Sequence, residues 1–308
     1  MKKFKLSIII PTWNRKKKLI ILINSITKKL NKFNINYEIN ICDSYSRDGS
    51  EIAIKKLFKN YRCINFYNIN ENNISKKRNF GIKKSLYPNI LLLDDDCIPI
   101  KNFFFILKKY LINSKGKEIF FGQYYTQPKL LLNSNYYKFR DLKNLKTNKL
   151  INLNYNNVVT GCCFFKGNLI KKKIYFNDKI KGYGLEDIEW AHRLKNKKFK
   201  LLLSEAKVDH QETSRNISAY VIKWYMLSKD AMPSILSNKK IKMKGKIFLF
   251  ESIFANFFFR YFLKFLNYFF IKPFSIMLKF ILLKTDNQKY LFSSTAFNIL
   301  LFLYYLRG

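Results

Sequence analysis

The first hundred residues alternate short apolar runs with helical patterns, and this alternation constrains the fold more strongly than any other feature of the chain. Segments with apolar residues at three- and four-residue spacing separate the runs, as amphipathic helices require. Strands that alternate with helices in this way predict an α/β fold with a mostly parallel sheet, covered by helices on both faces. The four apolar runs occupy residues 6–10, 39–41, 63–67 and 90–93.

The pattern is less regular beyond residue 100. Apolar runs predict further strands, and a helical pattern follows a short segment that contains two glycines. The strands are expected at 118–126, 157–165 and 199–203, and the helix at 186–195.

Polar residues follow the ends of three of the first four strands. In open α/β sheets, ligands bind outside the carboxyl ends of the strands. We therefore expect one ligand site along this edge. Its candidate residues are Pro11, Thr12 and Trp13 after the first strand, Asp43 after the second, and Asp94, Asp95 and Asp96 after the fourth.

The aspartate triplet requires compensation for its charge. Three adjacent carboxylates repel one another, and burying them at a strand end adds a desolvation cost. A divalent cation with oxygen ligands would offset that charge and could bridge to substrate phosphates. Strand alternation would place Asp94 and Asp96 on one side and Asp95 on the other. Taken alone, the triplet would fit a solvated acidic turn equally well.

The motifs of the chain, taken in order, strongly resemble those of family 2 glycosyltransferases of the GT-A type. The resemblance covers about residues 5–212, and the order of the motifs makes it specific. In the amino-terminal half the motifs are residues 6–15, Asp43 ahead of Asp48-Gly49-Ser50, Arg78-Asn79-Phe80-Gly81, and residues 93–99. Residues 181–189 and Asp209-His210-Gln211-Glu212 are similar to the carboxyl half of galactosyltransferase-type members.

This resemblance implies roles for individual residues. Those expected to bind the donor nucleotide are Pro11, Thr12, Trp13, Asp43, Arg78, Asp94 and Asp95; those expected to bind Mn²⁺ or Mg²⁺ are Asp96, Asp94 and His210. Asp187 is expected to be the catalytic base, with Glu186 beside it, and the acceptor is expected to contact Tyr183, Gly184 and Glu186. Tyr183 replaces the usual Trp of its motif, so the resemblance does not determine the identity of the acceptor. Ser44-Tyr45 replaces the common Asp-Gly, so the resemblance does not determine which nucleobase is bound.

The chemistry of sugar transfer agrees with these roles. Transfer from a nucleoside diphosphate needs positive charge on the leaving diphosphate and a base for the acceptor hydroxyl. One base implies inversion at the anomeric carbon, whereas retention by double displacement would need a second carboxylate as nucleophile. Glu189 is a candidate for that second role, but its spacing from Arg193 predicts an ion pair along the helix.

Composition leaves two other readings to weigh. The chain has 58 Lys+Arg against 20 Asp+Glu, a net charge of +38, and 48% of its residues are hydrophobic, which excludes a disordered basic tail. A non-catalytic basic protein that binds RNA or a membrane would explain the charge. It would explain neither the aspartate triplet nor the Gly-Tyr-Gly-Leu-Glu-Asp sequence at 182–187, and no nucleic-acid partner is expected. A sugar nucleotidyltransferase would need a Gly-rich phosphate loop after the first strand, and the absence of such a loop from the sequence argues against this reading.

The chain has five cysteines and no CxxC spacing, which favours a reducing cytoplasm as its location.

The chain after residue 214 is expected to form a helical extension of a catalytic domain at 1–214. A basic run at 239–246 precedes a Phe-rich stretch at 247–283. Charge followed by apolar surface suits the anionic cytoplasmic face of a membrane. Helices that pack on the catalytic domain and a membrane span at 290–306 are the alternatives. A helical stripe is expected from Phe254, Phe258, Phe262, Phe265 and Phe269.

These inferences combine into one predicted function. The chain is expected to be an inverting, metal-dependent glycosyltransferase that uses a nucleotide-diphosphate sugar, with a UDP-sugar as the expected donor. The expected acceptor is a glycan or a lipid-linked molecule in surface polysaccharide assembly. The expected location is the cytoplasm, peripheral to the cytoplasmic face of the membrane.

Overall fold

The computed structural model describes residues 3–33, 35–167, 172–180, 182, 184–211, 217–233 and 265–307. The chain divides into two compact units. The first, called here the α/β unit, comprises Met1–Tyr125, Asn144–Asp178 and Glu186–Glu212. The second, called here the helical unit, comprises Thr126–Lys143, Lys179–Leu185 and Thr213–Gly308. The helical unit thus includes two segments that precede residue 214, and the domain division at that residue stays a prediction.

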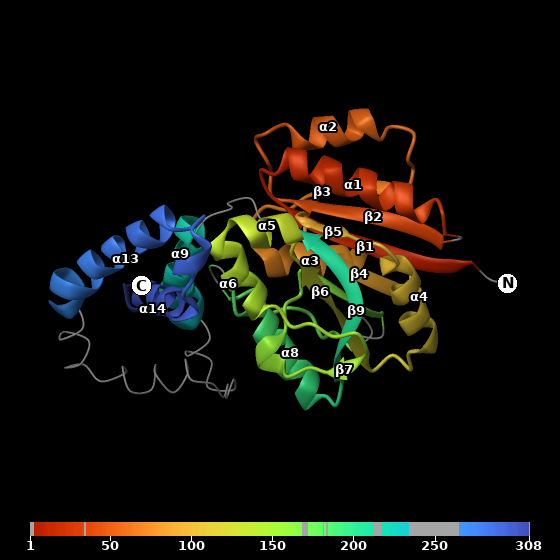
Figure 1. Cartoon of the computed structure of the whole chain (residues 1–308). Coiled ribbons are helices and arrows are strands. Elements are labelled where there is room, and N and C mark those ends of the chain that lie inside the picture. Colours follow the sequence, from red (N-terminus) through yellow and green to blue (C-terminus); the bar gives the residue numbers. More distant parts are fainter. Residues whose placement is uncertain are drawn as a thin grey trace. The chain divides into compact units, whose positions relative to one another are not determined.

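The first four strands of the α/β unit lie where the sequence predicted them. They are β1 (Phe4–Thr12), β2 (Ile35–Asp43), β3 (Ile64–Asn68) and β4 (Asn89–Leu93), and they are joined by α1 (Lys16–Leu30), α2 (Ser50–Leu57) and α3 (Ile74–Lys84). All three neighbouring pairs in the order β3-β2-β1-β4 are parallel. This half confirms the predicted strand–helix alternation (Figure 1).

The rest of the sheet corrects the prediction of a mostly parallel arrangement. The further strands are β5 (Cys97–Pro99), β6 (Glu118–Tyr125), β7 (Ile151–Asn152), β8 (Cys162–Lys166) and β9 (Lys200–His210). Strand β8 is antiparallel to both β4 and β6, and β9 is parallel to β6 but antiparallel to β5 and β7. The nine-stranded sheet is therefore mixed. An apolar run does not reveal the direction in which its strand enters the sheet, so the pattern could not predict this half.

Alternate residues of the central strands face two separate cores. Leu6, Ile8 and Ile10 of β1 pack with α1, α2 and α4 (Phe103–Asn113). Ile9 faces the other side and packs with α3 and α8 (Glu186–Asn196), which contributes the fully buried Trp190. The period-two alternation of buried side chains is that of a strand covered on both faces.

Close packing of α3 on the sheet depends on Gly81. A Cβ atom at this position would lie 2.3 Å from Cγ2 of Ile9 and 3.1 Å from Sγ of Cys42. Any larger residue would force the helix away from β1 and β2. Arg78 lies one turn earlier on the same helix, so this contact also fixes the position of Arg78.

The helical unit has a core of its own. Its described residues form α5 (Pro128–Asn133), α6 (Asn135–Lys143), α9 (Ile217–Met226), η2 (Leu227–Ala231), η3 (Asn267–Ile271), α13 (Lys272–Lys284), η4 (Lys289–Leu291) and α14 (Ser294–Arg307). Phe139 of α6 stacks on Phe297 of α14 with ring centroids 4.8 Å apart, next to the fully buried Leu300. The backbone N–H of Tyr136 donates to Oδ1 of Asp286 at 2.7 Å, which ties α6 to the turn before α14.

The helical unit presents many apolar side chains to solvent. On α13, Phe274, Met277 and Phe280 are 46–59% exposed. Phe265 and Phe269, the last two residues of the predicted stripe, are also exposed, and their rings lie 4.9 Å apart. The basic run at 239–246 and the other three stripe residues lie outside the described residues. Among the helices that the structure describes, none combines the length and the hydropathy of a membrane span.

Candidate active site

The ends of β1 and β2 lie side by side, as the sequence predicted, and the end of β3 lies next to that of β2. Thr12 pairs with Asp43 in the β1–β2 register, and Asp43 pairs with Asn68 in the β2–β3 register. The buried carboxylate of Asp43 accepts from the backbone N–H of Ser46 at 2.6 Å and from the Ser46 hydroxyl. Trp13 is 47% exposed, so it belongs to this edge and not to the core. Pro11 lies buried beside Cys42.

The aspartate triplet forms a turn, which corrects the prediction of strand alternation. The N–H of Cys97 donates to the carbonyl of Asp94 at 3.0 Å and closes the turn between β4 and β5. In this turn Asp95 and Asp96 face the same partner, Arg15, while Asp94 faces Arg78. Two different arginines therefore compensate the charge of the three carboxylates.

Arg15 compensates two of the three carboxylates, and the sequence reasoning did not single it out. Its Nη1 lies 2.8 Å from both Oδ1 of Asp95 and Oδ2 of Asp96. The Thr12 hydroxyl donates to the other oxygen of Asp95 at 2.7 Å. Burial, opposed by Arg15 and aided by the charge of Asp96, raises the pKa of Asp95 to about 6. Asp95 thus fixes the ends of β1 and β4 against each other.

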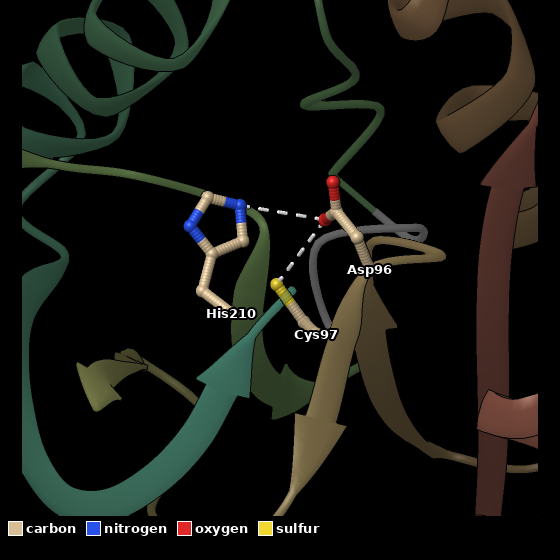
Figure 2. Close-up of side chains that lie close together, drawn as sticks. All are labelled: Asp96, Cys97 and His210. Atoms are coloured by element: carbon tan, nitrogen blue, oxygen red, sulfur yellow. Dashed lines mark hydrogen bonds and ion pairs between the residues drawn. The ribbon is translucent and has the colours of Figure 1, made fainter. Parts of the chain in front are cut away.

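Asp96, Cys97 and His210 form a cluster with the spacing of a metal site (Figure 2). Their ligand atoms all lie within 4.8 Å of one another, and Nε2 of His210 is 3.5 Å from Oδ1 of Asp96. Burial would raise the pKa of Asp96, but the hydrogen bond and charge of His210, together with Arg15, hold this pKa well below its usual value. Burial raises the pKa of the Cys97 thiol well above its usual value, so the carboxylate and the imidazole are the better ligands. Asp94, the other predicted metal ligand, is not in this cluster.

His210 is positioned by the strands around it. It ends β9 and pairs with Cys97 of β5 across the antiparallel ladder. The Tyr124 ring stacks on the imidazole with centroids 4.5 Å apart. The pairing and the stacking bring a residue more than a hundred positions away in the sequence to the aspartate turn.

Arg78 joins the aspartate turn to the first turn of α8. The guanidinium is buried, and its Nη2 donates to Oδ1 of Asp94 at 3.1 Å. Its Nη1 lies 3.0 Å from Oδ1 of Asp187 and 3.3 Å from Oε1 of Glu186. One guanidinium therefore serves three carboxylates.

Asp187 is held in place from two sides. Thr160 donates its backbone N–H to Oδ2 at 3.0 Å and its hydroxyl to Oδ1, which also accepts from Arg78. The Asp187 side chain keeps 18% of its surface exposed. The sequence reasoning missed Thr160 because its contact with α8 depends on where β8 enters the sheet.

Glu186 and Glu189, the neighbours of Asp187 on α8, are placed differently. Burial and then the charge of Asp187 raise the pKa of Glu186 to about 8, although Arg78 opposes this shift. Glu186 therefore keeps its proton at neutral pH. Glu189 pairs with Nε of Arg193 at 2.6 Å, which confirms the predicted ion pair along the helix.

Gly161 leaves room for the aspartate turn. Its carbonyl accepts from the N–H of Asp94 at 2.9 Å. A Cβ at this position would lie 2.2 Å from Oη of Tyr124 and 2.8 Å from Oδ2 of Asp94. A side chain here would displace both residues, so the site requires glycine.

Lys77 is a further residue at this edge that the sequence reasoning missed. It is buried, and its Nζ donates to the carbonyl of Thr12 at 3.0 Å and to Oδ1 of Asn72 at 2.9 Å. Burial, opposed by the charges of Asp95 and Asp43, lowers the pKa of Lys77 to about 8.

The predicted acceptor residues are described only in part. Gly184 lies in the turn before α8 with φ of 90°, and its segment belongs to the helical unit. Glu186 belongs to the α/β unit. Tyr183 lies outside the described residues.

Comparisons with known proteins show what the chain is similar to. A family model described as "Glycosyl transferase family 2" matches residues 7–175. An abequosyltransferase, RfbV of Salmonella typhimurium, is 42% identical over 81 residues, which are 26% of this chain and 24% of that protein. The match therefore spans about a quarter of the length of that relative. The crystal structure of S. aureus TarS 1-349 has a TM-score of 0.50 and 15% identity, and the match covers 78% of this chain and 67% of that one. This last likeness concerns the fold alone.

Proposed function

The chain belongs to glycosyl transferase family 2 with a GT-A fold, and from this premise we propose that it transfers a sugar, with inversion, from a nucleoside-diphosphate donor to an acceptor hydroxyl. The Arg78 network carries this proposal. It joins Asp94, at the edge where a nucleotide would bind, to Asp187 on α8. A donor-binding group and a candidate base are thereby held in one site.

Asp187 is the base in this proposal. Arg78 and Thr160 orient its carboxylate, and 18% of the side-chain surface stays exposed, where an acceptor hydroxyl could approach. Its two neighbours are less suited, because Glu186 holds a proton and Glu189 is paired with Arg193. A single base supports direct displacement by the acceptor oxygen, which inverts the anomeric carbon.

Asp96 and His210 fit a divalent cation, and we propose Mn²⁺ or Mg²⁺. A buried carboxylate with a low pKa beside an imidazole is a suitable donor set for Mn²⁺, and the carboxylate also suits Mg²⁺. Such an ion, when bound, supplies positive charge that stabilises the leaving diphosphate. Arg15 holds the second oxygen of Asp96 and so fixes the direction of the carboxylate.

The donor is proposed to be a UDP-sugar that lies along the ends of β1, β2 and β4. Asp43 would bind the base, and the exposed Trp13 ring offers a surface on which the base can stack. Lys77 and Asp95 hold Thr12 in place. The similarity to an abequosyltransferase supports a role in surface polysaccharide assembly, with a glycan or a lipid-linked molecule as acceptor.

The helical unit is proposed to bind the cytoplasmic face of an anionic membrane. Its exposed apolar side chains on α13 lie among Lys272, Lys279 and Lys284. Cationic side chains interspersed with apolar ones suit association in the plane of such a surface.

A screen of nucleotide sugars tests the proposed function. The full-length protein is mixed with each donor, with and without Mn²⁺ or Mg²⁺, and release of the nucleoside diphosphate is followed. One donor is expected to give metal-dependent release, and NMR of the product is expected to show an inverted anomeric configuration. Release of nucleoside diphosphate from none of the donors, or a retained configuration, would contradict the proposal.

A further inference from the structure

The helical unit contains a cavity of about 310 Å³, and none of its lining residues belongs to the candidate active site. Its six lining residues carry two cations, two phenol groups and one carboxamide, and none of the six is acidic. This volume is at the lower end of the range for small-ligand sites. The lining residues are Ile222 and Tyr225 of α9, Asn267 of η3, Lys272 of α13, and Tyr304 and Arg307 of α14.

Arg307 is oriented by contacts with two neighbours. Its Nη1 donates to Oγ of Ser275 at 3.0 Å, and its guanidinium carbon lies 4.5 Å from the centroid of the Tyr304 ring. Ser275 is fully buried and donates in turn to the carbonyl of Lys272 at 2.8 Å. A guanidinium has five N–H donors in a fixed plane, so the contact with Ser275 leaves donors that can bind an anion.

Asn267 lines the cavity, and its carboxamide holds an unsatisfied acceptor. Its Oδ1 is buried and has no hydrogen-bond partner. A buried acceptor without a donor is costly, and rotation of the carboxamide toward a ligand hydroxyl would relieve that cost. The cavity therefore offers binding groups for an oxyanion and for a hydroxyl. The planar donors of Arg307 match the oxygens of a phosphate, and Lys272 adds a second positive charge.

The elements that line the cavity also present apolar side chains to solvent. Tyr268 and Phe270 of η3 are 71% and 63% exposed, and Phe274 of α13 is 46% exposed. Over residues 217–233 and 265–307, seven Lys or Arg side chains stand against two Asp. A ligand that carries both a phosphate and a long apolar chain matches both properties.

We propose that this cavity binds the phosphate diester head group of an anionic lipid whose alcohol bears a free hydroxyl. Lys272 and Arg307 would bind the phosphate, and Oδ1 of Asn267 would accept from the hydroxyl. The proposal rests on the proposed membrane binding of the helical unit and goes beyond sugar transfer, which its test does not use. Equal binding to lipids with and without a free hydroxyl would contradict this proposal and leave both membrane binding and sugar transfer standing.

Vesicle binding by the full-length protein tests the proposal. The vesicles contain phosphatidylcholine with either phosphatidylglycerol or phosphatidylethanol, two lipids of the same charge of which only the first has free hydroxyls. We expect about tenfold tighter binding to phosphatidylglycerol, and a loss of about tenfold or more in Arg307→Gln. Arg307 is the last residue of α14, so the fold should persist. Lys289→Gln removes the same charge from an exposed position outside the cavity, and it should change binding less than about twofold.

Three results would overturn the proposal. Equal losses in Arg307→Gln and Lys289→Gln would mean that diffuse charge binds the membrane. Equal binding to the two lipids would remove the role of Asn267. Calorimetry with soluble glycerol phosphate distinguishes the source of the phosphate: binding as tight as that of the vesicles would assign the cavity to a free phosphate ester. Much weaker binding would support the lipid.

Discussion

The two units differ in the burial and pairing of their charged side chains. In the α/β unit, Arg78, Asp95, Asp96 and Glu186 are buried and lie in networks of hydrogen bonds and ion pairs. The helical unit has only four of the twenty acidic residues, and much of the surface of its helix α13 is apolar and cationic.

This difference separates two kinds of function. Buried and paired charges have fixed positions, which acid–base chemistry and metal binding require. Exposed apolar and cationic side chains suit a surface that meets a partner. Substitutions in one unit should therefore change one function and leave the other nearly intact.

Asp187→Asn should have the largest effect of the variants considered, and it should lower the rate of transfer without changing donor affinity. The amide keeps the shape of the carboxylate but cannot accept the proton, so transfer should fall by a factor of about 10²–10⁴. Steady-state rates with the best donor from the screen measure the loss, and calorimetry should show nearly unchanged donor affinity. Glu51→Gln, at an exposed pair on α2, is the control. Near-normal turnover in Asp187→Asn would assign the base to another residue.

Leu300→Ala should destabilise the helical unit without reducing nucleotide binding. Leu300 is fully buried in α14, and such a truncation costs about 2–5 kcal/mol of unfolding free energy. Leu91→Ala, the same change in the core of the α/β unit, is the matched variant. Scanning calorimetry with and without the donor measures both effects. An equal loss of nucleotide affinity in the two variants would show that the units do not function separately.

His210→Ala should weaken metal-dependent donor binding by at least about 10–100-fold, the loss that follows even when a residue that only supports a metal ligand is removed. Vesicle binding should not change, because His210 lies in the α/β unit. Donor titrations with and without Mn²⁺ measure the effect, and a chelator should reduce the wild-type affinity to the same level. Equal affinities of wild type and variant in Mn²⁺ would remove His210 from the metal site.

The last predicted effect is a pH dependence of stability that originates at Glu186. Its pKa rises from 4.5 to about 8 on folding, so between these values the folded protein holds a proton that the unfolded chain has released. The free energy of unfolding should then fall as pH rises through this window, by at most about 1.4 kcal/mol per pH unit. Glu186→Gln cannot titrate and should show a shallower fall in urea unfolding at pH 5, 6.5 and 8. Parallel curves would contradict the shift.

The sequence predicted the parts of the molecule that local patterns determine. The first four strands and the polar edge at Thr12, Asp43 and Asp94 follow from apolar periodicity and strand ends. The predicted side-chain directions of the aspartate triplet were wrong, because side chains in a three-residue turn do not follow the two-residue period of a strand. Arg15 and Thr160 were missed because their partners, Asp95 and Asp187, are distant in sequence.

Long-range pairing also explains the remaining differences. The direction of β8 and the place of residues 126–143 in the helical unit depend on contacts that no local pattern records. The hydrogen bond from the backbone N–H of Tyr136 to the Asp286 carboxylate, for example, links residues 150 positions apart. By contrast, the pair of Glu189 and Arg193 lies within one helix, and spacing alone predicted it.

The sharing of Arg78 among three carboxylates limits the order in which this site can evolve. A lineage that replaced Arg78 first would leave the charges of Asp94 and Asp187 without their common cation, and the site would lose stability. A lineage that first neutralised Asp94 would reduce that penalty before the arginine was replaced. The effect of a substitution at residue 78 therefore depends on which carboxyl groups are still charged. This epistasis favours loss of a carboxylate before loss of the arginine and disfavours the opposite order.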